Sequence, residues 1–466
     1  MTIALTQFRS ELYESLPYRA DALLDLIDAL ASNTTARSAI ELSLNPLFRR
    51  QHNSLPDAID NYFQASEPDE AVEKRWARQL MLARLIGPRL PESTSRSFWL
   101  LGIDVTPMPR PFARTLADRT FIYQPNAVKG VKPINIGHQA SVVACLPEKG
   151  AQDPPWLIPL LISRVPSDLT SGAMGVKQVR ALLTDEALPF AQALTVLVGD
   201  GAYGVAPFLG SLADLDHLVV ASRVAANRVF YRQAPATPKP GRGHPRWYGA
   251  PFRLKEPDTW GEPDETHTGI YISRRGRTYT LELRGWYDLL MRDKKDLPMH
   301  QYPFTLVRAS LLDEQGQPVF QRPLWFVIFG QRRRQLSLRE AWDSYDQRSD
   351  LEHFFRFGKQ KILWLDYQTP IVEHEENWWE IVQVAYLQLW LARDLVINLP
   401  RPWERYLPEA NGKTPSPAMV QRDFGRIIRQ IGTPAKPPKP RGKSPGRAKG
   451  YEPGRRKRQP VLKKAT

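Results

Sequence analysis

The sequence predicts an α/β protein in which a mixed β-sheet follows a helical region and is interrupted by a β-rich insertion. Three observations predict this fold class. Apolar residues recur at helical spacing before residue 95, three strand-like segments and then alternating helices and strands follow, and hairpin patterns fill residues 228–332. Three strands followed by alternating helix and strand are typical of an α/β fold with a mixed sheet.

Residues 1–95 are expected to form a helical N-terminal domain. Leu23, Leu24, Ile27 and Leu30 repeat at helical spacing, and a second such set lies between residues 77 and 85, before Pro91. The pattern is that of a helical bundle.

Residues 96–227 and 333–400 are expected to form two parts of one sheet domain. Strands are predicted in SFWLLGIDVTP, RTFIYQP, HQASVVACLP, LTVLVGD and HLVVASRV, with helices over Lys177–Leu183 and within GVAPFLGSLADL. Further helices are predicted from Ser337 past Lys361 and from Asn377 to Asn398.

Between these two parts, residues 228–332 are expected to form a β-rich insertion subdomain. GIYIS and TYTLELRGW flank the turn RRGR, and FTLVRASLL and LWFVIFG flank DEQGQ, as in two hairpins. A helical segment is expected over 401–430. The tail over 431–466 is expected to be disordered because it is basic, rich in Pro and poor in apolar residues.

The net charge of +15 is concentrated in this tail. Residues 431–466 contain twelve Lys or Arg and one Glu, which leaves +4 for the other 430 residues. Such a basic balance favours a polyanionic partner. Cys145 is the only cysteine, so no intramolecular disulfide can form. Neither a signal peptide nor a membrane span is predicted, and a cytoplasmic location is expected.

Two carboxylates lie at the ends of predicted strands. Asp104 follows the apolar run FWLLGI and precedes TPMPRP, and Asp200 lies in LTVLVGDGAYG. A carboxylate at a strand end can face a cleft, although Asp residues in such positions more often make turns.

The glycines around Asp200 leave a second interpretation open. Gly199, Gly201 and Gly204 fit the G-x-G-x-x-G fingerprint of a dinucleotide site, and Arg223 follows the next predicted strand, where it could meet a 2′-phosphate. A carboxylate inside that loop would repel the pyrophosphate, so no nucleotide cofactor is expected.

A third carboxylate lies in a polar stripe of the predicted helix SYDQRSDLEHFFRFGKQK. At about 100° per residue, Tyr345, Arg348, Glu352 and Lys359 fall within an arc of about 60°. Taken alone, this stripe could be a solvated face with an Arg348–Glu352 ion pair, which stabilises a helix by a few tenths of a kcal/mol.

The spacing of these four residues resembles the Y-R-E-K signature of bacterial insertion-sequence transposases, which belong to the retroviral-integrase-like superfamily and have an RNase H-like catalytic fold. In that family the first Asp ends the first strand, the second follows the fourth strand in a DGAYG-like motif, and the Glu lies on a helix after a β-rich insertion. Asp104, Asp200 and Glu352 stand at the matching positions. The similarity spans roughly residues 97–395.

The resemblance implies a cut-and-paste DNA transposase with an Asp–Asp–Glu triad. Asp104, Asp200 and Glu352 would be catalytic and would hold two Mg²⁺ ions, for which Mn²⁺ can substitute. The partners would be double-stranded DNA, as transposon ends and as target, and a second copy of the chain in a homodimer. The expected location is the bacterial cytoplasm, in association with the nucleoid. The alternatives are a catalytically inactive or domesticated DNA-binding relative and an RNase H-like nuclease without strand transfer.

The resemblance also implies DNA contacts. Tyr345, Arg348 and Lys359 would hold phosphates near the cut. Some relatives flip a base onto a Trp of the insertion, and Trp325 lies in the matching place, although its apolar neighbours are typical of a core.

Other basic segments are candidate DNA contacts. Lys239, Arg242 and Arg246 lie in a Pro/Gly-rich loop of the insertion and are expected to follow the DNA backbone. The cluster over residues 455–458 would add non-specific affinity, or else would only keep the tail soluble. Residues 1–95 form either a purely structural helical bundle or a module that binds DNA ends or mediates dimerisation.

Overall fold

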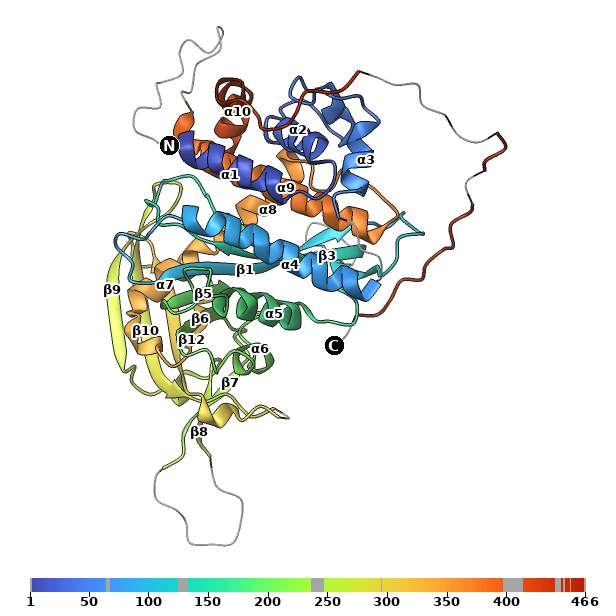
Figure 1. Ribbon diagram of the computed structural model, residues 1–466. Helices are drawn as coiled ribbons and strands as arrows, with labels where there is room; N and C mark the ends of the chain where they lie inside the picture. Colours follow the sequence, from blue (N-terminus) through green and yellow to red (C-terminus); the bar gives the residue numbers. More distant parts are fainter. Residues whose placement is uncertain are drawn as a thin grey trace.

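The structure is a computed structural model that describes residues 2–63, 68–124, 133–235, 247–294, 296–396, 414–440, 446, 449–452 and 454–464. A ten-stranded mixed sheet forms its centre (Figure 1). The strand order is β2 (Thr120–Tyr123), β3 (Ile134–Cys145), β1 (Trp99–Pro109), β5 (Thr195–Gly199), β6 (Leu218–Arg223), β12 (Leu324–Phe329), β11 (Phe304–Leu312), β10 (Thr278–Leu289) and β9 (Glu265–Ile272), and β4 (Ile158–Arg164) also pairs with β3.

The middle of this sheet confirms the predicted mixed α/β architecture. Strand β5 pairs in parallel with β1 on one side and with β6 on the other, and the remaining ladders of the sheet are antiparallel. All five residues of β5 are buried, as expected for a parallel strand that is covered on both faces. Strand β4 was not predicted, because Pro159 interrupts an otherwise apolar run.

The β-rich insertion is present, but its main strands extend the central sheet. The two predicted hairpins are β9–β10 and β11–β12, and β12 then pairs antiparallel with β6. The predicted insertion over 228–332 is therefore continuous with the central sheet, because β12 pairs with β6. Two more strands, β7 (Val229–Gln233) and β8 (Tyr248–Arg253), form a small sheet of their own.

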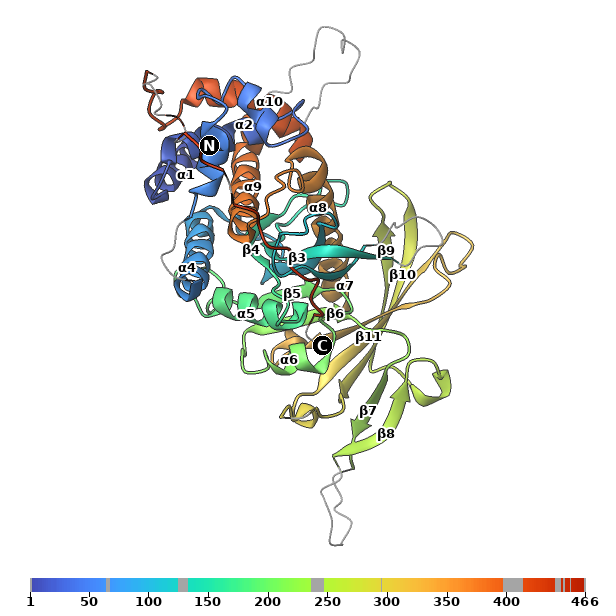
Figure 2. The same ribbon diagram turned by 90° about the vertical axis from the view of Figure 1, so that its right-hand side faces the viewer.

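Helices cover both faces of the sheet (Figure 2). Their bounds are α1 (Thr2–Ser15), α2 (Ala20–Ala31), α3 (Ser54–Asp60), α4 (Pro68–Ile86), α5 (Ser171–Leu183), α6 (Ala206–Gly210), α7 (Leu338–Gln347), α8 (Ser349–Lys361), α9 (Val372–Ala392) and α10 (Pro417–Ile431). Figure 2 shows α4 and α5 on one side of the sheet and α7 and α8 on the other.

The N-terminal helices share a core with the C-terminal ones. Helix α9 is buried along most of its length and contacts α1, α2, α3 and α10. The buried Arg9 of α1 donates hydrogen bonds to Asp28 of α2 and Gln388 of α9. Residues 1–95 are therefore not a domain with a core of their own. No helix among the described residues is both long and apolar enough to cross a membrane.

The described part of the C-terminal tail contacts the folded body. Ala435 is buried, and its carbonyl accepts a hydrogen bond from Arg49. Farther on, the backbone N–H of Gln459 donates to the carbonyl of Arg114, and that of Leu462 donates to the carbonyl of Arg119. The prediction of disorder over 431–466 does not hold for these residues, because Ala435 packs beside Arg49 and the backbone N–H groups of Gln459 and Leu462 find acceptors next to β2.

Candidate active site

The first two candidate carboxylates lie side by side at the centre of the sheet. In the parallel pair of β1 and β5, Leu101 is opposite Leu197 and Gly102 is opposite Val198. Continuing this register by two residues places Asp104 level with Asp200. Adjacent strands of a sheet are about 4.8 Å apart, so the two residues are neighbours.

The surroundings of Asp104 differ in one respect from the prediction. Strand β1 does not end at Asp104 but continues to Pro109, paired with β3 alone. Strand β5 ends at Gly199, so Asp104 lies where β1 loses its partner on that side. An opening in the sheet, and not the end of the strand, gives this carboxylate its access.

The third carboxylate comes from a pair of nearly continuous helices. Helix α7 begins with a capping box between Ser337 and Glu340, and Arg348 links its end to the start of α8. One helix was predicted here, and the chain remains helical in conformation at Arg348, with φ −49° and ψ −32°. Glu352 lies in the first turn of α8, which packs against β1.

Arg348 connects two of the three carboxylates. Its Nη1 lies 3.2 Å from Oδ2 of Asp104, and its Nη2 lies 3.2 Å from Oε1 of Glu352. One guanidinium therefore bridges an acid of the sheet and an acid of the helix, which brings the polar stripe of α7 and α8 onto the open edge of β1.

The neighbouring acids and burial affect the protonation of Asp104. Burial, and then the negative charge of Asp200, raises the pKa of Asp104 to about 7, and Glu352 adds to this effect. Arg348 opposes the shift without cancelling it. Negative charge thus exceeds positive charge at this point, as is common where a cation binds.

Two other stripe residues also face β1 and its neighbours. Lys359 donates to Oγ1 of Thr106 at 2.6 Å and to the carbonyl of Pro107 at 2.8 Å, and burial lowers its pKa to about 8. The ring of Tyr345 stacks on Phe326 of β12, with centroids 5.6 Å apart and planes 7° apart. The stripe therefore spans from β12 to the far half of β1.

The glycines near Asp200 have a packing explanation. A Cβ on Gly199 would lie 2.8 Å from the ring of Tyr203, and a Cβ on Gly204 would lie 2.4 Å from the carbonyl of Arg223. Asp200 itself accepts the backbone N–H of Ala202 at 2.8 Å. Helix α6, which follows, has only five residues. Close packing thus accounts for Gly199 and Gly204, whereas a Cβ on Gly201 would meet nothing nearer than 3.8 Å.

Trp325 is not placed for the role that its position suggested. Its side chain is 2% exposed and packs against Trp260, Trp286 and Phe252. A base cannot stack on a ring whose faces are already covered, so the core interpretation is the correct one. Lys239, Arg242 and Arg246 lie outside the described residues.

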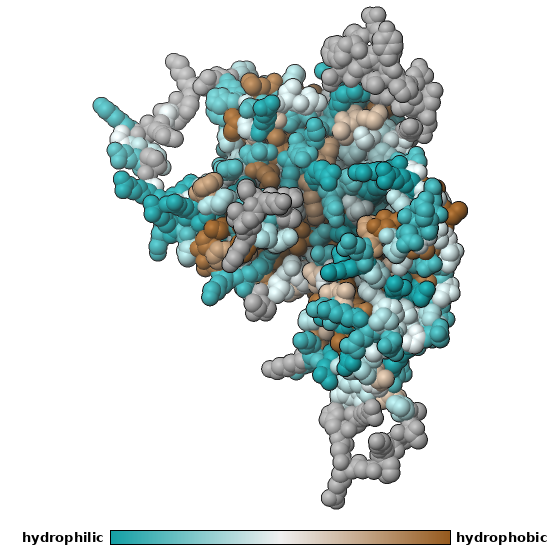
Figure 3. Space-filling view, turned by 180° about the vertical axis from the view of Figure 1, so that it is seen from behind, coloured by the Kyte–Doolittle hydropathy of each residue, from teal (hydrophilic) through white to brown (hydrophobic). Residues whose placement is uncertain are grey.

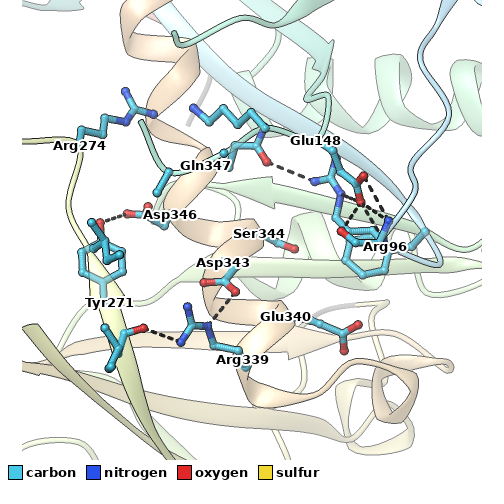
Figure 4. Close-up of a pocket in the computed structure, with 17 residues that line it drawn as sticks. Arg96, Glu148, Tyr271, Arg274, Arg339, Glu340, Asp343, Ser344, Asp346 and Gln347 are labelled. Atoms are coloured by element: carbon cyan, nitrogen blue, oxygen red, sulfur yellow. Dashed lines mark hydrogen bonds and ion pairs between the residues drawn. The ribbon is translucent and has the colours of Figure 1, made fainter. Parts of the chain in front are cut away.

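The opposite face of α7 carries a second polar cluster, around a cavity of about 570 Å³ (Figure 4). Tyr271 of β9 donates to Asp346 at 3.0 Å, and the fully buried Asp350 pairs with Lys149 at 2.6 Å and with Arg274 of the β9–β10 turn. The charges here are matched, in contrast to those around Asp104. This cluster holds the insertion against the helix that carries Glu352.

Sequence reasoning missed Tyr203 and Asp350. Tyr203 is fully buried, and burial together with the charges of Asp104 and Asp200 raises its pKa well above the ordinary value. Its place in the DGAYG segment was the available signal. Asp346 and Asp350 are four residues apart beside the polar stripe, which indicates a second polar face of the same helices.

The donor set suits a hard divalent cation. Asp104, Asp200 and Glu352 offer oxygen ligands only, as Mg²⁺ prefers. Within the described ranges, no group of three His, Cys, Asp or Glu side chains is already arranged to hold a metal ion. Glu352 is 56% exposed, so its side chain is free to change rotamer towards the two aspartates.

Comparison with known families agrees with this geometry. The family described as DDE superfamily endonuclease matches residues 11–292, which is more than half of the chain. The chain belongs to this DDE family. The matched region includes Asp104 and Asp200 and ends before Glu352. The assignment of Glu352 as the third carboxylate is therefore supported by its place in the structure and by the residue spacing on its helix, and not by the family match. No curated protein matches the chain.

Proposed function

We propose that this DDE family member is a cut-and-paste DNA transposase whose catalytic residues are Asp104, Asp200 and Glu352. One observation carries the proposal: the β1–β5 register sets Asp104 level with Asp200, and Arg348 joins Asp104 to Glu352. Three acids from distant parts of the chain are otherwise costly to gather, since their charges repel.

The three carboxylates would hold two divalent ions, Mg²⁺ or Mn²⁺. When bound, the ions supply an activated oxygen nucleophile and stabilise the departing oxygen of the phosphodiester. The acids would hold these ions, and Asp200 is kept in position by its contact with the N–H of Ala202.

The cations of the stripe would bind the DNA backbone. Arg348 offers a planar fork for phosphate oxygens, and Lys359 offers a point charge. In the structure, Arg348 occupies its fork with Asp104 and Glu352. Asp104 and Glu352 would hold the metal ions, and the fork of Arg348 would hold a phosphate oxygen beside them. The ends bound would be the inverted repeats of a transposon, paired by two copies of the chain.

The direct test is cleavage and joining of DNA that carries the coding sequence with its native flanks. Wild type should cut the flanks in Mg²⁺ and join the ends to a target. The variants Asp104→Asn and Glu352→Gln should each lose at least about 100-fold in cleavage rate, because metal ligands matter more than their outer-shell partners. Asp214→Asn, which removes an exposed partner of Arg180, is the matched control.

The outcomes separate the alternatives. Cleavage without joined products would favour a nuclease without strand transfer. Binding of the flanks with no cleavage by wild type would favour an inactive relative. Full activity of Asp104→Asn would remove the proposed site.

A further inference from the structure

Four arginines converge on a groove of about 780 Å³ beside the candidate active site. Arg223 is the last residue of β6, Arg284 lies on β10, Arg308 lies on β11, and Arg322 lies in the β11–β12 connection. They come from four separate segments, so the concentration of charge is a product of the fold and not of a basic run in the sequence.

In the part of the chain that the structure describes, these four arginines have no carboxylate partner, although the guanidinium of Arg308 lies over the ring of Trp260, 5.4 Å from its centroid. By contrast, Arg75, Arg164 and Arg274 each contact a carboxylate. Among the described residues, none of the four groove arginines forms an ion pair or donates a side-chain hydrogen bond. The groove is lined by a single carboxylate, that of Glu282.

The arrangement is unfavourable for the protein alone. Arg284 and Arg308 lie directly opposite each other on adjacent strands, where like charges destabilise a sheet. Burial and then the charge of Arg284 lower the pKa of Arg308. Two buried nitrogens of lining residues, Nε of Arg308 and Nε1 of Trp342, have no hydrogen-bond partner within the described structure. Anionic acceptors are what this groove lacks.

Arg223 connects one end of the groove to the surroundings of the candidate active site. Arg223 is opposite Phe326 across the β6–β12 ladder, and Phe326 stacks on Tyr345. The charges of Arg348 and Arg223 act together on Tyr345 and limit the rise of its pKa that burial causes. Arg223 is therefore the groove arginine nearest to Arg348, whereas Arg284 and Arg308 are in register with Trp325 and lie on the other face of the sheet.

An exposed ring completes the lining. Phe320, in the β11–β12 connection, is 63% exposed and borders the groove. Figure 3, seen from behind, shows that hydrophilic residues dominate the surface of the insertion and that the hydrophobic patches are small and separate. An isolated aromatic beside a row of cations is typical of proteins that bind single-stranded nucleic acid, because each base offers a face for stacking.

We propose that this groove binds an unpaired stretch of the DNA strand that leads away from the candidate active site. The arginines hold successive phosphates, and Phe320 stacks on an unpaired base. This inference rests on the proposed function, since it takes DNA as the substrate. It places the strand-binding residues on the insertion sheet, in positions that the polar stripe of α7 and α8 does not include.

Binding without catalysis tests the proposal. Wild type and Arg284→Gln/Arg308→Gln are compared by fluorescence anisotropy on a 20-nucleotide single strand and on the matching duplex, in EDTA, over a range of salt concentrations. We expect the double variant to bind the single strand about 10-fold more weakly. Its slope of log affinity against log salt should fall by about 1.4, which is 0.7 for each lost phosphate contact. The loss on the duplex should be smaller.

The second variant set tests the ring. Phe320→Ala should weaken single-strand binding by about fivefold or more, whereas Phe320→Trp should retain it, because both Phe and Trp can stack. The matched control is Arg253→Gln, an exposed arginine of the insertion that pairs with Glu256. The double variant should melt close to the wild-type temperature, because it removes a repulsive pair and also the contact of Arg308 with the ring of Trp260.

Three results would overturn the proposal: unchanged single-strand binding by the double variant, an equal loss on duplex and single strand, or the same loss in Arg253→Gln. The assay needs no cleavage, so it is independent of the triad. If Asp104→Asn cleaves normally while the groove variants lose binding, the proposed catalytic site is wrong and the groove stands.

Discussion

At the scale of single residues, the surroundings shift the pKa values of two carboxylates, Asp104 and Glu148, in opposite directions. Asp104 has its pKa raised to about 7 by burial and by neighbouring acids. Glu148 has its pKa lowered to about 2 despite partial burial, because it accepts hydrogen bonds from the backbone N–H groups of Thr94, Ser95 and Arg96. The first is suited to bind a cation, and the second fixes the loop that enters β1.

The Glu148 contacts make a pH-dependent prediction. Glu148→Gln should lower the free energy of unfolding at pH 7 by about 1–2 kcal/mol, after allowance for its partial exposure. The folded pKa lies below the ordinary value of 4.5, so this contribution is present above pH 4.5 and is lost as the pH falls towards 2.

The measurement is the unfolding of both proteins in urea at pH 7, 5 and 3. The difference between them should shrink by more than half from pH 5 to pH 3. Glu186→Gln, at an exposed position, is the control and should change little at any pH. A difference that stays constant with pH would mean that Glu148 acts through packing and not through its charge.

At the scale of elements, α8 is held on both of its faces. Lys359 and Arg348 connect it to β1, and Asp350 connects it to the β9–β10 turn. Its end is also packed closely, since a Cβ on Gly358 would lie 2.6 Å from the ring of the buried Trp364. The position of Glu352 thus depends on contacts along the whole helix.

The close contact at Gly358 gives a prediction whose sign is informative. Gly358→Ala should destabilise the protein by about 1–3 kcal/mol through overpacking, although Ala favours a helix by up to about 1 kcal/mol. Gly425→Ala on α10 is the matched control, because its Cβ would meet nothing nearer than 3.8 Å, and it should be neutral or stabilising. The measurement is the free energy of unfolding of the two variants and wild type in urea. A Gly358→Ala protein as stable as wild type would show that Trp364 can move.

The contact between the insertion and α8 gives a second prediction at this scale. Asp350→Asn leaves Lys149 and Arg274 without their buried counter-charge and should cost about 3 kcal/mol of stability. Asp343→Asn removes only the exposed pair with Arg339 and should cost less than about 0.5 kcal/mol. Equal melting temperatures for the two variants would contradict a holding role for Asp350.

At the scale of the whole molecule, the sequence predicts local structure better than the connections between parts. The apolar run of β5, the RRGR and DEQGQ turns and the helical stripe of α7 and α8 are local patterns, and the structure confirms the elements they predict. The periodicity of the helix also predicted that Arg348, Glu352 and Lys359 lie on one side of it.

The rest depends on contacts between distant segments. Pairing of β12 with β6 joins the insertion to the central sheet, and α9 shares its core with α1 and α2. The sequence around Trp325 does not reveal whether its ring is exposed or covered, because the covering residue Trp260 lies 65 positions earlier. No local sequence pattern decides the pairing of β12, the packing of α9 or the burial of Trp325. The sequence therefore left these features undecided or predicted them wrongly.

The basic tail gives the last prediction. Its described residues from 454 to 464 run along the edge of the sheet, anchored by the backbone of Gln459 and Leu462, and Arg455, Arg456 and Arg458 are exposed just before the anchor, as is the lysine between them. A tail held in this way presents four cations at a fixed place on the body, which favours contact with duplex DNA over free solvation.

Replacing these four basic residues with Gln should lower the slope of log affinity against log salt for duplex DNA by up to about 3.6, which is 0.9 for each lost phosphate contact. Stability should not change, because the anchoring groups are backbone atoms outside the substituted positions. Arg180→Gln, an exposed arginine that pairs with Asp214, is the control for general loss of charge. If the quadruple variant keeps the wild-type salt slope while it binds DNA, the tail cluster does not contact DNA and serves only as a solvated surface.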